Sequence, residues 1–216
     1  FNDLLECLAR GAKNTLAVGA AATSIGIIVG VVTLTGVGFR LGYVVIQTAG
    51  DIGGFFLNFL PFNYFTLQDL TLFFSLILIA ISCIFMGTGV PTTATYIILV
   101  AVAAPALTQL QIEPIVSHFF VFYYGVLADI TPPVALAAYA AAGIAGSNPF
   151  TTGNTAFRLG IAKALVPFVF VYSPSLLLVA QGFNFYDFFV TLISAMIGIG
   201  LIGIGFTGYL FKSVST

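Results

Sequence analysis

The feature that most constrains this chain is a series of long apolar stretches that contain almost no charge. Only 6% of the 216 residues are charged and 60% are hydrophobic, whereas roughly 25% are charged in a typical soluble domain. So few charges cannot form the surface of a water-soluble globule. We therefore predict an all-α integral membrane protein, a polytopic helix bundle that is surrounded by the lipid bilayer and does not bind nucleic acid.

The apolar stretches outline a single membrane domain, residues 1–216. Residues 1–15 predict a short amphipathic helix at the membrane interface, and the uncharged run Thr15–Phe39 predicts the first span, which loosens near Gly36 and Gly38. Residues 40–69 are interpreted as a partly embedded connection. C-terminal helices are expected over 155–211, with spans at Leu165–Ala180 and Phe185–Phe211 that follow a polar loop over 147–163.

The positions of the basic residues predict which ends of the spans face the cytoplasm. Arg40 falls on one side, and the others fall on the opposite side: Arg10, Lys13, Arg158, Lys163 and Lys212. Because basic residues concentrate on the cytoplasmic side, the N-terminal helix, the 147–163 loop and the C-terminus are predicted to be cytoplasmic. This rule does not distinguish a re-entrant hairpin over 70–108 from two full spans.

A first break interrupts the predicted helical hairpin 70–108 at GTGVPTTATY, residues 87–96. No helix passes unbroken through Gly87, Gly89 and Pro91. Non-helical backbone at membrane depth occurs only where protein or a watery cavity surrounds it, so the break predicts an ion or substrate site. The alternative is a tight turn between two helices with a threonine cap.

A second break divides the predicted broken helix 114–146 at ADITPP, residues 128–133. Asp129 follows an apolar run, and an ionised carboxylate at membrane depth costs at least about 2.5–3.5 kcal/mol, so a functional role is the default interpretation. Neither Pro132 nor Pro133 has an N–H group, which leaves earlier carbonyls available to an ion. The alternative is a proline kink in which Asp129 caps the following helix.

These motifs resemble the large membrane (permease) subunit of a TRAP transporter. The stretches that carry the resemblance are GTGVPTTATYIILVAVAAPAL, HFFVFYYGVLADITPPVALAAYAAAGIAGSNPFTTGNTAFRLG and VPFVFVYSPSLLL, and the fused permease of the TAXI subtype is the most similar kind. The resemblance covers nearly the whole chain and is weakest over residues 40–69.

The resemblance implies Na⁺-coupled symport of small organic anions, usually carboxylates, across the bacterial cytoplasmic (inner) membrane. It also implies an elevator mechanism and two kinds of partner, an extracytoplasmic solute-binding protein and a small membrane subunit. No cofactor is implied other than Na⁺ as coupling ion. The residues that the resemblance places in the ion or substrate site are Gly87, Thr88, Gly89, Pro91, Thr92, Thr93, Asp129, Thr131, Pro132 and Pro133, with Na⁺ ligands expected among Gly87, Thr88, Gly89, Asp129 and Thr131.

This sequence departs from the family pattern in one respect. The family builds its site from two inverted repeats, whereas only one hairpin motif and one TPP-type break occur here. We therefore expect the chain to be the C-terminal half of a longer permease, with the N-terminal half missing and no transport by these residues alone.

Two other classes of function remain as alternatives. An ion channel or a structural membrane subunit would need a continuous pore or an assembly role, and a hairpin with a threonine-rich tip suits an occluding carrier better. An intramembrane aspartyl protease would need a second membrane aspartate beside Asp129, and none of Asp51, Asp69 and Asp187 lies deep inside a predicted span.

Overall fold

The computed structural model describes residues 2–59, 64–178, 183–210 and 212–213. Within these residues the chain is almost entirely α-helical, and its only strands are the two-residue pair β1 (Tyr209–Leu210) and β2 (Lys212–Ser213). Four helices are long and apolar enough to cross a membrane, or five when one bent pair counts as a single span. The predicted all-α membrane class is therefore confirmed.

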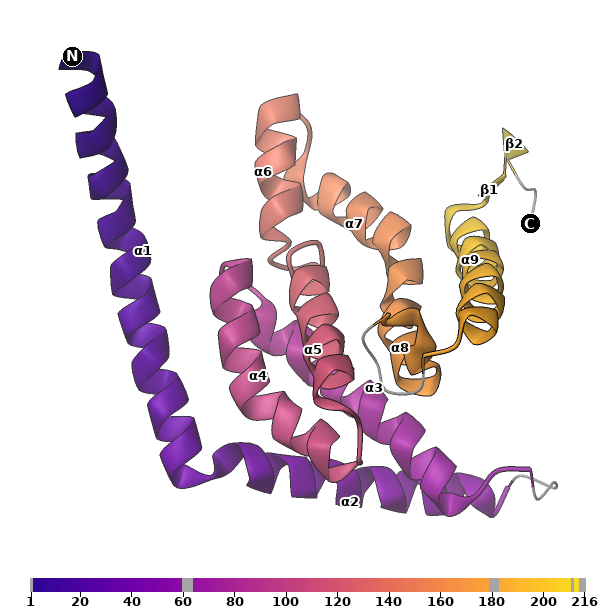
Figure 1. The fold of residues 1–216 in the computed structure, drawn as a ribbon. Helices are drawn as coiled ribbons and strands as arrows, with labels where there is room; N and C mark the ends of the chain where they lie inside the picture. The colour runs from indigo at the N-terminus through magenta and orange to yellow at the C-terminus, as the bar shows by residue number, and fades with distance from the viewer. Residues whose placement is uncertain (1, 60–63, 179–182, 211, 214–216) are drawn as a thin grey trace.

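The first two helices form an L. α1 (Asn2–Thr35) stands alone along most of its length, and α2 (Val37–Leu57) lies across one end of the molecule (Figure 1). They meet at Gly36, whose φ of 64° is a left-handed conformation that glycine adopts without strain, and the chain bends there by 66°. The expected loosening near Gly36 is thus a sharp bend.

One N-terminal sequence prediction was wrong: the described residues 2–15 do not form a separate helix, because α1 continues without a break through this stretch. The stretch 40–69, interpreted as a partly embedded connection, contains most of α2 and the start of α3. α2 fits closely against the hairpin that follows it. A Cβ on Gly38 would lie 2.7 Å from the Ala101 carbonyl oxygen, and one on Gly42 would lie 2.9 Å from the Ala106 Cα atom.

The hairpin predicted over 70–108 consists of α3 (Leu67–Gly87) and α4 (Thr92–Gln109). α3 begins at a capping box, in which the Asp69 N–H donates to the Thr66 hydroxyl oxygen at 3.2 Å and the Thr66 N–H donates to the Asp69 carboxylate at 2.9 Å. Residues 88–91 form the turn between the two helices. The turn of the tight-turn alternative is therefore present, but its threonine cap is not, because α4 has Pro91 at its N-cap and no capping side chain.

The broken helix predicted over 114–146 consists of α5 (Pro114–Ala128) and α6 (Leu136–Ala145), separated by residues 129–135. α5 begins with proline at its first position, where the missing N–H has no helical partner in any case. α6 ends at Gly146, whose φ of 65° suits a left-handed cap.

The C-terminal part contains more helix than the sequence predicted. α7 (Pro149–Gly160) occupies the stretch expected as a polar loop over 147–163, because Asn148 caps it by accepting from the Thr151 N–H at 3.1 Å. The 3₁₀ turn η1 (Ile161–Leu165) joins α7 to α8 (Val166–Tyr172), so the candidate span is Pro149–Tyr172 rather than Leu165–Ala180. The turn η2 (Pro174–Leu176) and α9 (Phe185–Thr207) complete the helices; residues 179–180 of the expected span lie outside the described part.

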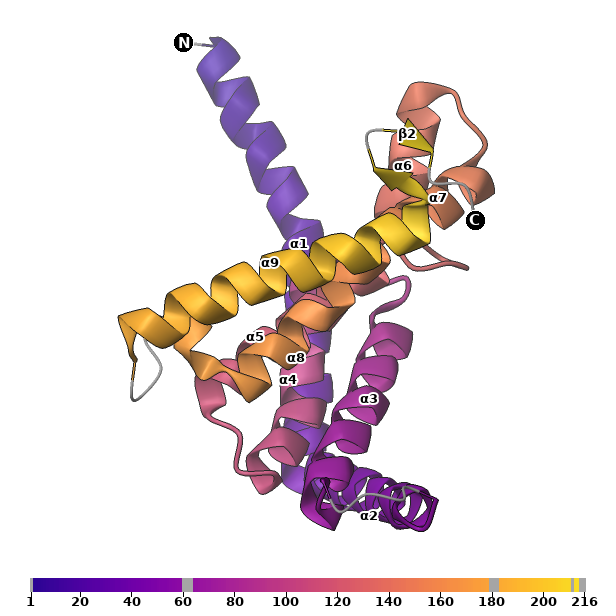
Figure 2. The same cartoon turned by 90° about the vertical axis from the view of Figure 1, so that its right-hand side faces the viewer.

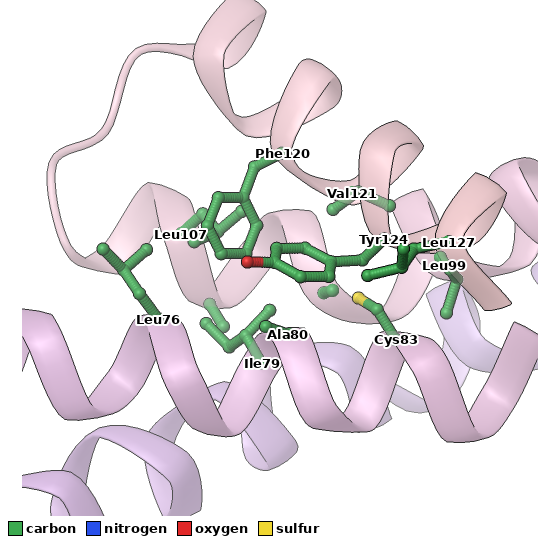
Figure 3. Packing of buried hydrophobic residues seen from close by; sticks show 12 residues of the cluster. Leu76, Ile79, Ala80, Cys83, Leu99, Leu107, Phe120, Val121, Tyr124 and Leu127 are labelled. Atoms are coloured by element: carbon green, nitrogen blue, oxygen red, sulfur yellow. The ribbon is translucent and has the colours of Figure 1, made fainter. Parts of the chain in front are cut away.

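One apolar cluster holds α3, α4 and α5 together (Figure 3). Phe120 and Tyr124 of α5 point between the two arms of the hairpin, and the Tyr124 hydroxyl donates to the Ala164 carbonyl of η1 at 2.6 Å. Side chains of α3 and α4 close around them: Leu76, Ile79, Ala80, Cys83, Leu99 and Leu107. The cluster fixes the hairpin against the first half of the broken helix.

Both breaks lie near the middle of the molecule. The hairpin rises from the level of α2 and turns back about halfway toward the level at which α1 begins (Figure 1). The view from the side shows the same level for the upper end of α3 (Figure 2). α5 climbs to that level and α6 continues beyond it. The core therefore positions the hairpin tip and the unwound segment at a common depth.

The central position of Phe120 yields a test of this core. Phe120 is fully buried, whereas Phe122 on the same helix is 44% exposed. We expect Phe120→Ala to lower the free energy of unfolding by roughly 3 kcal/mol, the lower end of the range for buried phenylalanine, because lipid already solvates apolar groups in the unfolded membrane state. Thermal unfolding in detergent measures the change. Phe122→Ala is the control, and an equal effect of both substitutions would contradict the assigned core.

Candidate ion and substrate site

The carboxyl-terminal ends of α3 and α5 touch each other. Gly87, the last residue of α3, is buried, and a Cβ at this position would lie 2.8 Å from the Ala128 Cβ and 2.9 Å from the Thr95 Cγ2. Ala128 is the last residue of α5. Only a residue without a side chain allows this approach, so Gly87 brings the hairpin turn against the point where the broken helix unwinds.

The other side of the turn contacts the unwound segment itself. The Thr92 side chain lies beside the Asp129 carboxylate. Gly89 has a φ of 79°, and a Cβ there would lie 3.6 Å from the Val134 Cγ1 atom. Thr92 begins α4, and Val134 lies just before α6. The amino-terminal ends of α4 and α6 therefore lie near each other as well.

The unwound segment keeps part of its backbone paired. The carbonyl of Asp129 accepts from the Ala137 N–H at 3.1 Å, and that of Thr131 accepts from the Ala135 N–H, also at 3.1 Å. Among the described residues, five other carbonyls at the two breaks accept no hydrogen bond. These are the carbonyls of Thr88, Gly89, Ile130, Pro132 and Val134. Polar groups at membrane depth need a partner, so these oxygens are available to an ion or to water.

Helix dipoles give the site its electrostatic pattern. The carboxyl-terminal ends of α3 and α5 carry partial negative charge, and the Asp129 carboxylate adds to it. The amino-terminal ends of α4 and α6 carry partial positive charge. The arrangement therefore offers one place for a cation and, beside it, one for an anion, as in the discontinuous helices of secondary transporters.

The structure brings together four of the predicted site residues, Gly87, Gly89, Thr92 and Asp129. Two predicted hydroxyls are directed to their own helices: Thr88 donates to the Phe85 carbonyl at 2.8 Å and Thr131 donates to the Leu127 carbonyl at 2.7 Å. Pro132 is half-buried in the unwound segment. The remaining predicted residues, Pro91, Thr93 and Pro133, are exposed.

The alternative role for Asp129 as cap of the following helix is wrong. α6 has Ala135 at its N-cap and no capping side chain. The Asp129 backbone, not its carboxylate, is tied to α6 through the bond from the Ala137 N–H. The carboxylate is therefore left for the hairpin and for a ligand.

Sequence reasoning did not assign a role to the residues that make this close contact possible. Thr95 is buried, donates to the Val90 carbonyl at 3.0 Å and places its methyl group against Gly87 and Gly125. A Cβ added to Gly125 would lie 3.3 Å from the Thr95 methyl group. The sequence shows that Gly125 is a small residue one turn before a break, which indicates a close helix contact. It does not reveal which helix makes that contact.

The oxygen atoms at the two breaks are of the chemical kind that coordinates hard cations. Within the part of the chain that the structure describes, no cluster of three His, Cys, Asp or Glu side chains forms a metal centre. One carboxylate and several neutral carbonyl oxygens are the kind of ligands that hard cations prefer. The carbonyl oxygens of Thr88, Gly89 and Ile130 and the Asp129 carboxylate are oxygen ligands of this kind.

This organisation, in which a hairpin tip faces a discontinuous helix, is typical of membrane transport proteins. Comparison with protein families agrees. The profile described as "Tripartite ATP-independent periplasmic transporter, DctM component" matches residues 1–185, and the chain belongs to this family of transporter membrane subunits. Searches of curated proteins and of solved structures found no match.

A cross-linking experiment tests the contact between the hairpin and the break. In a variant with Cys7 and Cys83 replaced by alanine, we expect Thr92→Cys and Asp129→Cys to form a disulfide under mild oxidation, because the two side chains are neighbours. Mass spectrometry of the linked peptides measures the yield. The control pairs Thr92→Cys with Ala145→Cys at the far end of α6, and equal yields would refute the contact.

Proposed function

We propose that the chain is the C-terminal half of a TAXI-type fused permease that takes up small organic anions, chiefly carboxylates, by Na⁺ symport. An extracytoplasmic solute-binding protein delivers the substrate, and the N-terminal half and a small membrane subunit, separate or fused, complete the transporter. The family membership supports the transporter class. The coupling ion, the substrate class and the partners are parts of the proposal.

The observation that carries this proposal is the meeting of the α3 and α5 carboxyl ends at Gly87 and Ala128, beside Asp129. Two negative helix ends and a carboxylate stabilise a cation at this point, and the unpaired carbonyl oxygens supply ligands. The adjoining amino ends of α4 and α6 suit the carboxylate of a substrate. Binding of Na⁺ would then favour binding of the anion beside it, which is the physical basis of symport.

The arrangement in space supports a re-entrant hairpin. The hairpin turns back at the level where the broken helix unwinds, so its tip and the break meet near the middle of the molecule (Figure 1). In an elevator mechanism such a hairpin moves together with the broken helix, because one core cluster joins them. α2, which lies across their lower end, is positioned to connect this moving unit to α1.

The proposed orientation places both ends of the chain on the cytoplasmic side of the bacterial inner membrane. The start of α1 and strand β2 lie on the side of the molecule opposite α2, which carries Arg40 (Figure 1). Arg158 donates to the Phe206 carbonyl at 3.3 Å near the end of α9. The basic residues of α7 and the C-terminus are therefore on the same side, as the positive-inside rule requires.

Substitution of Asp129 tests the cation site directly. In the complete transporter, reconstituted in liposomes with its solute-binding protein, we expect Asp129→Asn to reduce Na⁺-driven uptake at least tenfold, because the substitution removes the full negative charge of the site. Gly89→Val should have the same effect, since its φ of 79° disfavours a β-branched residue. Uptake is measured with a panel of radiolabelled dicarboxylates, keto acids and acidic amino acids.

Asp187→Asn provides the matched control. Asp187 lies in the first turn of α9, far along the chain from either break, and its substitution should leave uptake unchanged. Membrane insertion of all variants is checked by the amount of purified protein. Uptake that survives both Asp129→Asn and Gly89→Val would refute the proposed site.

A further inference from the structure

α7 lies directly against the unwound segment of the broken helix. A Cβ on Gly153 of α7 would lie 2.8 Å from the Cε1 atom of Tyr139, and a Cβ on Gly160 would overlap the Ile130 side chain. Ile130 belongs to the unwound segment and Tyr139 to the first turn of α6. Gly153 therefore leaves space for the Tyr139 side chain of α6, and Gly160 leaves space for the Ile130 side chain of the unwound segment.

The Tyr139 hydroxyl forms a hydrogen bond with the unwound segment near the start of α6. It donates to the Pro133 carbonyl at 2.6 Å. Pro132 and Pro133 have no N–H group, so the backbone around them is poor in donors, and a side-chain donor is the means of fixing this carbonyl. The Tyr139 ring lies against Gly153, which determines where the hydroxyl is placed.

We propose that Tyr139 is a positioning residue of the cation site. Its hydroxyl fixes the Pro133 carbonyl and so holds the segment that carries the free carbonyls of Ile130 and Pro132, while α7 supports the ring through Gly153. The proposal rests on the Na⁺ site proposed above. It gives α7 a role in cation binding, although no residue of α7 lies in the site itself.

Removing the hydroxyl alone tests the proposal. In the complete purified transporter, we expect Tyr139→Phe to raise the half-saturating Na⁺ concentration about tenfold, because one hydrogen bond that orients the ligands is lost. The concentration is obtained from the Na⁺-induced rise in unfolding temperature, with K⁺ used to hold the ionic strength constant. This measurement does not require the substrate to be known.

Tyr124→Phe is the matched control. The Tyr124 hydroxyl also donates to a carbonyl at 2.6 Å, that of Ala164 in η1, so its loss removes a bond of the same kind outside the break. We expect this variant to lower the unfolding temperature without changing the half-saturating Na⁺ concentration. A merely structural role of Tyr139 predicts the same behaviour for both variants.

A second pair of variants leaves both hydroxyls in place. Gly153→Ala should weaken Na⁺ binding as Tyr139→Phe does, because the new Cβ displaces the Tyr139 ring. Gly143→Ala on α6 should have no effect, since nothing lies within 4 Å of a Cβ there.

The outcomes separate this proposal from the proposed function. A selective loss of Na⁺ affinity in Tyr139→Phe and Gly153→Ala supports the positioning role. Unchanged Na⁺ affinity in both variants, or an equal loss in Tyr124→Phe, overturns that role while the Na⁺ response of the unmodified protein still supports the proposed function. A protein that shows no Na⁺ response at all overturns both.

Discussion

The structure depends on one constraint, the cost of leaving peptide groups unpaired where no water is available. A continuous helix meets this constraint by itself, but the chain leaves the helical conformation at residues 88–91 and again at 129–135. The two irregular segments are placed against each other, at the contact between Gly87 and Ala128. Each break is therefore shielded by the other, and the oxygens left unpaired between them are the proposed ligands of a cation.

Packing around the breaks relies on close approach rather than on polar contacts. Gly38 and Gly42 bring α2 to the hairpin, Gly87 brings the hairpin to α5, and Gly153 brings α7 to the broken helix. In lipid, where apolar burial provides little driving force between helices, such close van der Waals contact is a main source of association. The same glycines thus hold the helices together and determine where the breaks meet.

The sequence predicted the membrane class, the hairpin and the broken helix because Gly, Pro and charge are strong local signals in an otherwise apolar chain. It predicted Gly87 and Asp129 as site residues for the same reason. It could not predict α2 or α7, because their helical pattern is interrupted by glycines whose role appears only when the neighbouring helix is known. Thr95 and Tyr139 were not among the predicted site residues, because the contacts of Thr95 with Gly125 and of Tyr139 with Gly153 join segments that the sequence does not place side by side.

The most direct test of the central claim is whether Na⁺ shields the hairpin tip. Val90 lies in the turn and contributes no charged or hydroxyl group, so Val90→Cys reports on access without removing a proposed ligand side chain. In the complete transporter without its native thiols, the rate of maleimide labelling is compared in Na⁺ and in K⁺ at equal ionic strength. We predict slower labelling in Na⁺, and no such difference when Asp129→Asn is added. Equal rates in Na⁺ and K⁺ before that change would contradict a cation site between the tip and the break.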